Sequence, residues 1–288
     1  MSLKPFSTIA TAIAHSPNLE ANIHESIRIK NSLAENLILI HVGKKTPEDE
    51  AKFISMINSA GGAAEEVEVV WREGDPVDVI LEVAEERNVE LIIAGAVPRE
   101  GLLRYYMGSI ARRLVRAPKC NSSILLMTNP SKMKTACGRI VVNGLDHPKT
   151  SDTIKKAVEV AGRFNARELV VVEEVEPSKI GARAEDDKSL AEVNEAKKRI
   201  GAKENERINN ILKEVEVISD LRISQKCIFG KPGYVIGHYA EKYCADLLIM
   251  NSPDTKLGFL DRVFTHHLEY ILSELPCDLL IVNSKSNR

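Results

Sequence analysis

The sequence lacks a long hydrophobic run and an excess of charge of either sign. A helix that crosses a membrane needs about 20 consecutive apolar residues, and no segment of the 288 residues approaches that length. The 39 Lys and Arg residues nearly balance the 41 Asp and Glu residues, which leaves a formal net charge of −2. A chain so close to neutral offers no electrostatic reason for nucleic-acid binding. We therefore expect no membrane and no nucleic acid among its partners.

Paired cysteines are also absent. The five cysteines stand singly in the sequence, at Cys120, Cys137, Cys227, Cys244 and Cys277. An odd number without C-x-x-C spacing suits a reducing compartment. No small-residue cleavage site follows the first apolar residues, so no signal peptide is expected. The expected localisation is cytoplasmic.

The sequence contains no recognisable catalytic motif. There is no Ser-His-Asp arrangement, no nucleophile elbow and no pair of carboxylates in a glycine-framed cleft. The adjacent His266 and His267 would point about 100° apart on a helix, so one ion would rarely be held by both. We assign no catalytic residue and no metal site.

One structural plan is used twice along the chain. In each half an apolar strand leads into a turn that contains proline, an amphipathic helix and a second apolar strand. The first strands are residues 8–14 and 139–143, and the second strands are residues 36–42 and 168–175. Later in each half, Gly-x-Pro opens a helix that leads to a buried strand, and a final strand follows another proline.

The repeated plan predicts an α/β fold of two tandem domains. The strands are nearly continuous in Val, Ile and Leu, which indicates sheets covered on both faces. Strands that alternate with helices form parallel βαβ units with right-handed crossovers. The polar residues 129–138 form a linker, which gives domains of residues 1–130 and 138–288. The most charged segment, residues 185–216, has apolar residues at helical spacing and predicts a long helix, with Gly201 as a potential break.

A glycine-rich loop follows a buried strand in the first half. Gly95 ends the strand, Gly101 lies within the loop, and Gly108-Ser109 opens the next helix. Ligands of doubly wound sheets bind beyond the carboxyl ends of the strands, and unpaired N–H groups at a helix start favour phosphate. The same glycines would also serve merely to end a strand, turn the chain and cap a helix. Spacing alone leaves both interpretations open.

The order of strands, the Gly-Asp-Pro turn, this loop and the closing strand after proline resemble the universal stress protein family, arranged as a tandem pair. The resemblance covers nearly the whole chain. It implies two Rossmann-like domains of the adenine nucleotide alpha hydrolase type, each a five-stranded parallel sheet flanked by helices. It also implies ATP or AMP as a ligand, with Mg²⁺ expected only together with the nucleotide. ATP-binding members carry Gly-x-x-Gly, nine residues, and then Gly-Ser or Gly-Thr.

The resemblance assigns binding residues in the first domain. Gly95 matches the first glycine of the family motif, Gly101 matches a glycine common in the spacer, and Gly108-Ser109 matches the last pair. Val42 matches a valine whose backbone contacts adenine in the family. The helix after Gly108 carries Arg112, Arg113 and Arg116, which we expect to form a solvated face.

Other positions depart from the family motif. Pro98 occupies the place of the second glycine and has no backbone N–H for a phosphate. Ala14 stands where the family has an Asp after the first strand. In the second half, Asn251 and Asp254 replace the first two glycines, and Thr265-His266 replaces the final Gly-Ser. Asp254 would repel a phosphate, so we predict at most one, weakened, adenine-nucleotide site, in the first domain.

These observations favour a universal stress-type regulatory or protective protein. One alternative is a nucleotide-free interaction or assembly protein, and a second is an adenine-nucleotide hydrolase, for which no base is visible. The family commonly dimerises through its last strand, and residues 123–127 can pair with residues 279–282 within this chain. We therefore expect an intramolecular pseudo-dimer of the two domains, while a higher oligomer stays open.

Overall fold

The first half of the chain alternates strands with helices as its sequence predicts. A computed structural model of the protein describes residues 4–98, 105–117, 120–133, 136–181, 185–215, 218, 220–253 and 268–284. The elements of the first half are β1 (Phe6–Ile13), α1 (Leu19–Leu33), β2 (Ala34–Val42), α2 (Pro47–Ser59), η1 (Ala64–Glu66), β3 (Val67–Arg72), α3 (Pro76–Glu86), β4 (Leu91–Gly95), β5 (Val97–Pro98), β6 (Tyr105–Tyr106), α4 (Ser109–Arg116) and β7 (Ser123–Met127).

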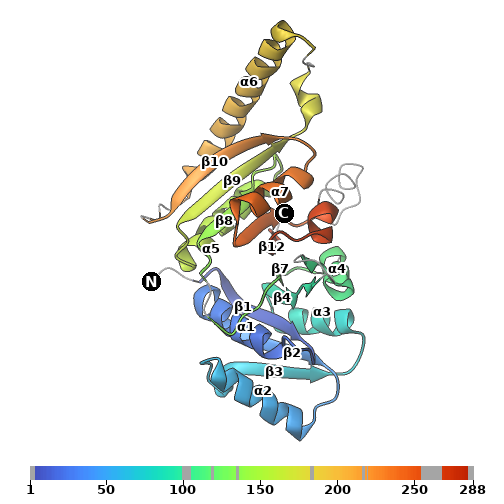
Figure 1. Cartoon of the computed structure of the whole chain (residues 1–288). Helices are drawn as coiled ribbons and strands as arrows, with labels where there is room; N and C mark the ends of the chain where they lie inside the picture. Colours follow the sequence, from blue (N-terminus) through green and yellow to red (C-terminus); the bar gives the residue numbers. More distant parts are fainter. Residues whose placement is uncertain are drawn as a thin grey trace.

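The second half repeats this order with a longer helix. Its elements are β8 (Arg139–Asn143), α5 (Thr150–Arg163), β9 (Glu168–Val175), η2 (Pro177–Ile180), α6 (Asp187–Leu212), β10 (Arg222–Phe229), α7 (Tyr234–Tyr243), β11 (Leu247–Asn251) and β12 (Asp278–Val282). Residues 268–273, just before β12, are also helical. The predicted long helix is confirmed as α6, which projects beyond the sheet (Figure 1) and runs through Gly201 without a break.

The two halves share one ten-stranded sheet of order β10-β9-β8-β11-β12-β7-β4-β1-β2-β3. All neighbouring strands within each half are parallel. This confirms the predicted α/β class and the parallel sheet of each half. A separate antiparallel pair, β5 and β6, lies in the glycine-rich loop of the first half.

Helices cover both faces of the sheet and bury its apolar side chains. Adjacent residues of a strand point to opposite faces, so Ile9 joins the core beneath α1, α2, α5 and α6, whereas Ala10 joins the core beneath α3, α4 and α7. Both residues are fully buried. This double burial explains why the strands are rich in aliphatic residues on both faces.

The Gly-Asp-Pro turn begins α3 as its residue types predict. The Asp75 carboxylate accepts hydrogen bonds from Val77 N (2.9 Å) and Asp78 N (3.3 Å), and Pro76 occupies the first helical position. A capping carboxylate satisfies N–H groups that have no partner within the helix, and proline does not need the N–H that it lacks there.

No helix within the described residues is both long and apolar enough for a membrane span.

The last strands of the two halves join the sheets. β7 and β12 run antiparallel, with Leu125 opposite Leu280, and this confirms the pairing expected from the sequence. Both ends of the ladder carry further bonds between the halves: Thr128 N and Oγ1 each donate to Asp278 Oδ1 at 2.8 Å, and Asn283 N donates to Ser123 Oγ at 3.1 Å. The two halves are thus joined within one chain, and corresponding strands follow the same order outward from this junction.

We expect the halves to stay associated after the linker is cut. If residues 130–133 are replaced by a protease site and cleaved, the fragments should still elute together at the size of the intact 31.9 kDa chain. The β7–β12 ladder and the cores on both faces do not depend on the covalent link. Size-exclusion chromatography of cut and uncut protein measures this, and fragments that elute separately would contradict a shared sheet.

Candidate functional site

The candidate site lies at the carboxyl ends of β1, β2 and β4 and at the start of α4. Gly95 is exposed at the end of β4, opposite Met127 of β7. The chain then leaves the sheet, where Ala96 N donates to Met127 O at 2.7 Å. This placement agrees with the expectation that ligands of such sheets bind beyond the carboxyl ends of the strands.

Gly108 and Ser109 form the start of α4. Gly108 is the N-cap residue, so no side chain caps the helix, and Ser109 is exposed as its first residue. A Cβ at Gly108 would lie 3.0 Å from Val97 Cγ2, which leaves no room for a larger side chain without movement of Val97. The uncapped N–H groups and the positive end of the helix dipole make this edge suitable for an anion. Gly101, the remaining predicted glycine, lies outside the described residues.

Asn22 is a candidate site residue that sequence analysis did not identify. It lies on α1, and a Cβ at Gly95 would lie 3.9 Å from Asn22 Nδ2 and 4.0 Å from Asn22 Oδ1. The buried Oδ1 atom meets no hydrogen-bond donor within the described part of the chain. A buried acceptor without a donor is costly, so this oxygen is suited to a hydroxyl or amine of a ligand beside Gly95. Only the contact across the fold distinguishes Asn22 from other helical asparagines.

Four rings gather at the carboxyl ends of β1 to β3. The His41 ring lies 4.8 Å from both the His15 and the Trp71 ring centroids, and Phe53 stacks on Trp71 at 4.9 Å. Burial lowers the pKa of His41, and the nearby His15 lowers it further. His41 is therefore neutral near pH 7, and its Nδ1 atom lies 3.3 Å from the Ile13 carbonyl oxygen.

Val42, predicted to contact adenine through its backbone, ends β2 half-buried, and its side chain packs on the face of the sheet opposite to these rings. The position where the family has an Asp is an exposed alanine, Ala14, directly after β1. This edge thus offers ring surfaces and the Asn22 amide, but no carboxylate at the place where the family has one.

The arginines of α4 lie on an exposed face, as their spacing suggested: the Arg113 and Arg116 side chains are each 52% exposed and Arg112 is 38% exposed. Each also pairs with a carboxylate. Arg113 makes two hydrogen bonds of 2.9 Å to the Asp75 carboxylate at the start of α3, and this guanidinium lowers the pKa of Asp75. Arg112 and Arg116 both bind Glu269 of the second half. The expected exposure is confirmed, whereas the carboxylate partners were not predicted because they come from distant parts of the sequence.

The second half fills the space that Gly95 leaves open in the first. Asn251 ends β11 as Gly95 ends β4, and it is 1% exposed. Its Nδ2 atom donates to Thr150 Oγ1 at 3.0 Å. An amide side chain therefore occupies the place where the family motif has a bare backbone. The other predicted differences, Asp254 and Thr265-His266, lie outside the described residues.

A buried glutamate occupies the second-half position that corresponds to Val42. Glu174 is 3% exposed, and its carboxylate accepts from Gly233 N at 2.8 Å, Ile236 N at 3.1 Å and Asn143 Nδ2 at 3.0 Å. The first two donors belong to the start of α7, so the Glu174 carboxyl group supplies an internal acceptor to the N–H groups of that helix N-terminus. The two consecutive glutamates of the apolar strand β9 were the sequence signal that analysis passed over.

Burial changes the ionisation of both glutamates. Desolvation raises the pKa of Glu174 to about 7, although the hydrogen bonds from Gly233, Ile236 and Asn143 oppose this shift. The neighbouring Glu173 points to the other face, where Arg207 Nη2 lies 2.7 Å from Glu173 Oε2. Desolvation raises the pKa of Glu173 to about 8, and the charge of Arg207 offsets part of the effect.

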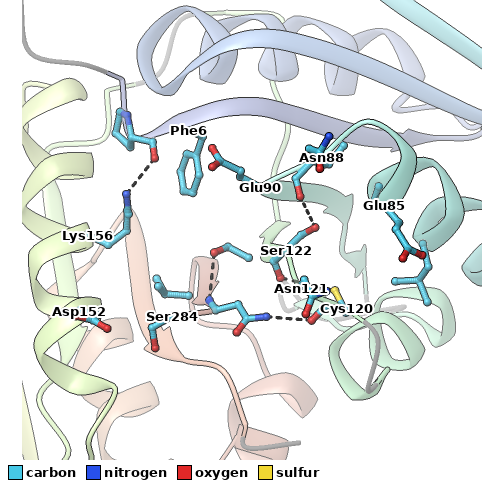
Figure 2. A pocket seen from close by; sticks show the side chains of 17 residues that line it. Phe6, Glu85, Asn88, Glu90, Cys120, Asn121, Ser122, Asp152, Lys156 and Ser284 are labelled. Carbon is cyan, nitrogen blue, oxygen red and sulfur yellow. Dashed lines mark hydrogen bonds between the residues drawn. The ribbon is translucent and has the colours of Figure 1, made fainter. Parts of the chain in front are cut away.

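A cavity of about 510 Å³ lies away from the glycine-rich loop, at the amino ends of the first-half strands. Figure 2 shows Phe6, Glu90 and Ser122 around it, with Lys156 of α5 on the other side. Ser122 Oγ donates to Val89 O at 2.6 Å, Glu90 Oε2 accepts from Ser7 N at 2.5 Å, and Lys156 Nζ donates to Pro5 O at 3.0 Å. These polar groups already bind the protein itself, so the cavity is not the candidate site.

Within the described residues no three His, Cys, Asp or Glu side chains are grouped to hold a metal ion.

Comparison with known proteins identifies a family for each half. The profile of the Universal stress protein family matches residues 8–124 and again residues 138–283. The chain is 44% identical over 61 residues to the Universal stress protein E homolog of Haemophilus influenzae, and this match covers 21% of the chain and 19% of that protein. It is 35% identical over 60 residues to a universal stress protein of Methanocaldococcus jannaschii, over 21% of the chain and 34% of that protein. These matches span less than two thirds of the length of either curated relative.

Solved structures share the fold of the whole chain. A putative universal stress protein from Pseudomonas aeruginosa UCBPP-PA14 superposes with a TM-score of 0.64 at 16% identity, over 96% of this chain and 93% of that one. A universal stress protein from Archaeoglobus fulgidus DSM 4304 gives a TM-score of 0.64 at 16% identity, over 96% and 98% of the two chains. At such low identity the likeness concerns the fold.

We expect Glu174 to make the stability of the protein depend on pH. Its pKa is about 7 in the folded chain against 4.5 for the ordinary group, so the folded state favours the protonated form. Its contribution to stability is therefore present below about pH 4.5 and is lost as the pH rises through about 7. The shift corresponds to about 3 kcal/mol.

Urea unfolding of the wild type and of Glu174→Gln at pH 5 to 8 measures this contribution. The variant cannot ionise at this position, so its unfolding free energy should fall less with rising pH than that of the wild type. Glu195→Gln, on an exposed position of α6, should keep the wild-type slope. If the unfolding free energies of Glu174→Gln and the wild type change equally with pH, Glu174 does not titrate over this pH range.

Proposed function

The chain belongs to the universal stress protein family and contains two of its domains in tandem, and we propose that it is a regulatory or protective protein that binds one adenine nucleotide in its first domain. The observation that supports this most directly is the shared edge of Gly95, Asn22 and the start of α4. Gly95 exposes backbone near the buried Asn22 acceptor, and α4 begins at Gly108 without a side-chain cap.

The phosphates would bind at the start of α4. Gly108 and Ser109 offer backbone N–H groups, a hydroxyl group and the positive end of the helix dipole. Arg112, Arg113 and Arg116 are held by Asp75 and Glu269, so we assign phosphate binding to the backbone and not to these side chains. Gly101 is a further proposed contact.

The nucleoside would lie toward α1 and the end of β2. Asn22 Oδ1 can accept a hydrogen bond from a ribose hydroxyl, and Val42 would contact the base through its backbone. Ala14 provides no carboxylate for the nucleoside, and Pro98 provides no N–H for the phosphates. Both losses favour a modest affinity for ATP or AMP, with Mg²⁺ bound only together with the nucleotide.

The second domain would not bind a nucleotide, because its own side chains occupy the corresponding places. Asn251 fills the space beside Thr150, and Glu174 binds the N–H groups at the start of α7. A phosphate would have to displace a buried carboxylate there. The proposed role of this domain is structural.

Ala14 and Pro98 also favour the rival function, a nucleotide-free interaction or assembly protein. Nucleotide titration separates the two functions, and release of phosphate from ATP would identify the second rival, a hydrolase.

The proposed localisation is cytoplasmic, since all five cysteines are free thiols as a reducing compartment would keep them.

Calorimetric titration with ATP and AMP, with and without Mg²⁺, tests the proposed site. Gly108→Val should abolish binding, because a Cβ at this position already lies 3.0 Å from Val97 and a larger side chain would obstruct the backbone. Asn22→Ala should weaken binding about fivefold through the loss of one hydrogen bond. Ala14→Asp should strengthen it by restoring a polar partner for the nucleoside.

The control is Asn58→Ala, on an exposed position of α2, which should bind as the wild type does. Absence of binding heat from the wild type with millimolar ATP and AMP would refute the proposed function and leave the glycines a purely conformational role.

A further inference from the structure

The glycine-rich loop of the first domain is attached to the second domain. Met107 N donates to Leu272 O at 3.0 Å, and Leu275 N donates to Tyr105 O at 3.0 Å. Met107 and Leu272 are 2% and 1% exposed. The backbone immediately before Gly108 is therefore fixed by the helical residues 268–273 and the turn that follows them.

The same part of the second domain also holds α4. Arg112 Nη1 lies 3.1 Å from Glu269 Oε2, and Arg116 Nε lies 3.1 Å from Glu269 Oε1. Residues four apart lie on one face of a helix, so one carboxylate binds both arginines and uses both of its oxygens. Beneath these ion pairs, Ala111 of α4 and Ile271 are buried in one apolar cluster.

The orientation of α4 is thus set from two directions. Arg113 ties it to Asp75 within the first domain, and Glu269 ties it to the second domain. A rotation of α4 would break one of these connections and would redirect the N–H groups at Gly108 and Ser109.

We infer that the second domain positions the phosphate-binding loop of the first, with Glu269 as the positioning residue that sets nucleotide affinity. This inference rests on the proposed function. Because linkage between binding and conformation is reciprocal, a bound nucleotide also strengthens the docking of residues 268–275 on the loop. The second domain would then contribute to the site without a ligand of its own.

The sign of the effect separates positioning from simple electrostatics. Glu269 carries a negative charge near a site for an anion, so its removal should tighten nucleotide binding if only long-range charge matters. If Glu269 positions α4, its removal should weaken binding, because the helix N–H groups lose their fixed direction.

Calorimetric titration of the full-length wild type, Glu269→Ala and Glu269→Asp with ATP measures this effect. Glu269→Ala should bind at least about fivefold more weakly. Glu269→Asp keeps a carboxylate that can reach the arginines and should recover affinity to within about twofold of the wild type. Glu195→Ala, the same change of charge on exposed α6, should leave affinity unchanged.

Hydrogen exchange without nucleotide should show faster exchange of the Met107 amide in Glu269→Ala than in the wild type.

Equal or tighter binding by Glu269→Ala, or no recovery in Glu269→Asp, overturns the inference. If the wild type binds no nucleotide, the proposed function itself fails, and the exchange measurement alone decides whether Glu269 positions the loop. Unchanged protection of the Met107 amide in Glu269→Ala then rejects that role.

Discussion

The antiparallel ladder between β7 and β12 is the interaction on which the arrangement of the whole protein depends. It joins two parallel five-stranded sheets into one and covers the edge strand that each half would otherwise expose. Because the ladder is antiparallel, the strands of the two halves point in opposite directions, and their carboxyl ends lie at opposite edges of the sheet. The ladder also places α4 next to residues 268–273 of the second half, so contacts that position the loop become available (Figure 1).

Corresponding positions of the two halves carry different side chains. Gly95 leaves exposed backbone in the first half, whereas Asn251 fills the corresponding place in the second with a hydrogen-bonded amide. At the end of the neighbouring strand, Val42 corresponds to Glu174, whose carboxylate binds the start of α7. In both pairs the second half carries the larger, polar side chain. Glu174 binds the start of α7, and Asn251 donates to Thr150, although Asn251 Oδ1, like Asn22 Oδ1, meets no donor within the described residues. These differences support the proposal that only the first domain binds a ligand.

Local sequence patterns predicted much of the fold. Aliphatic runs located the strands, Gly-Asp-Pro located the capped start of α3, and residues 185–216 contained the long helix α6. The pairing of residues 123–127 with 279–282 followed from the resemblance to a family that dimerises through its last strand. These features are either encoded within a few residues or shared by the family.

The parts of the site that sequence analysis missed all depend on contacts between distant residues. Asn22 becomes notable only because the fold places its amide beside Gly95, about 70 residues later in the chain. Glu174 lies within the otherwise apolar strand β9, and its partners Gly233 and Ile236 belong to the start of α7, 59 and 62 residues later in the chain. The carboxylate partner of Arg112 and Arg116 was not predicted because Glu269 lies in the other domain. Spacing along a helix cannot reveal a partner of that kind.

The stoichiometry of nucleotide binding tests this account most directly. The proposed division of roles predicts one ATP or AMP per chain in a calorimetric titration, with protection from hydrogen exchange appearing at Gly95 and at the start of α4. Two nucleotides per chain, or protection confined to the start of α7, would contradict the account, because the second domain would then bind ligand where Asn251 and Glu174 fill the space.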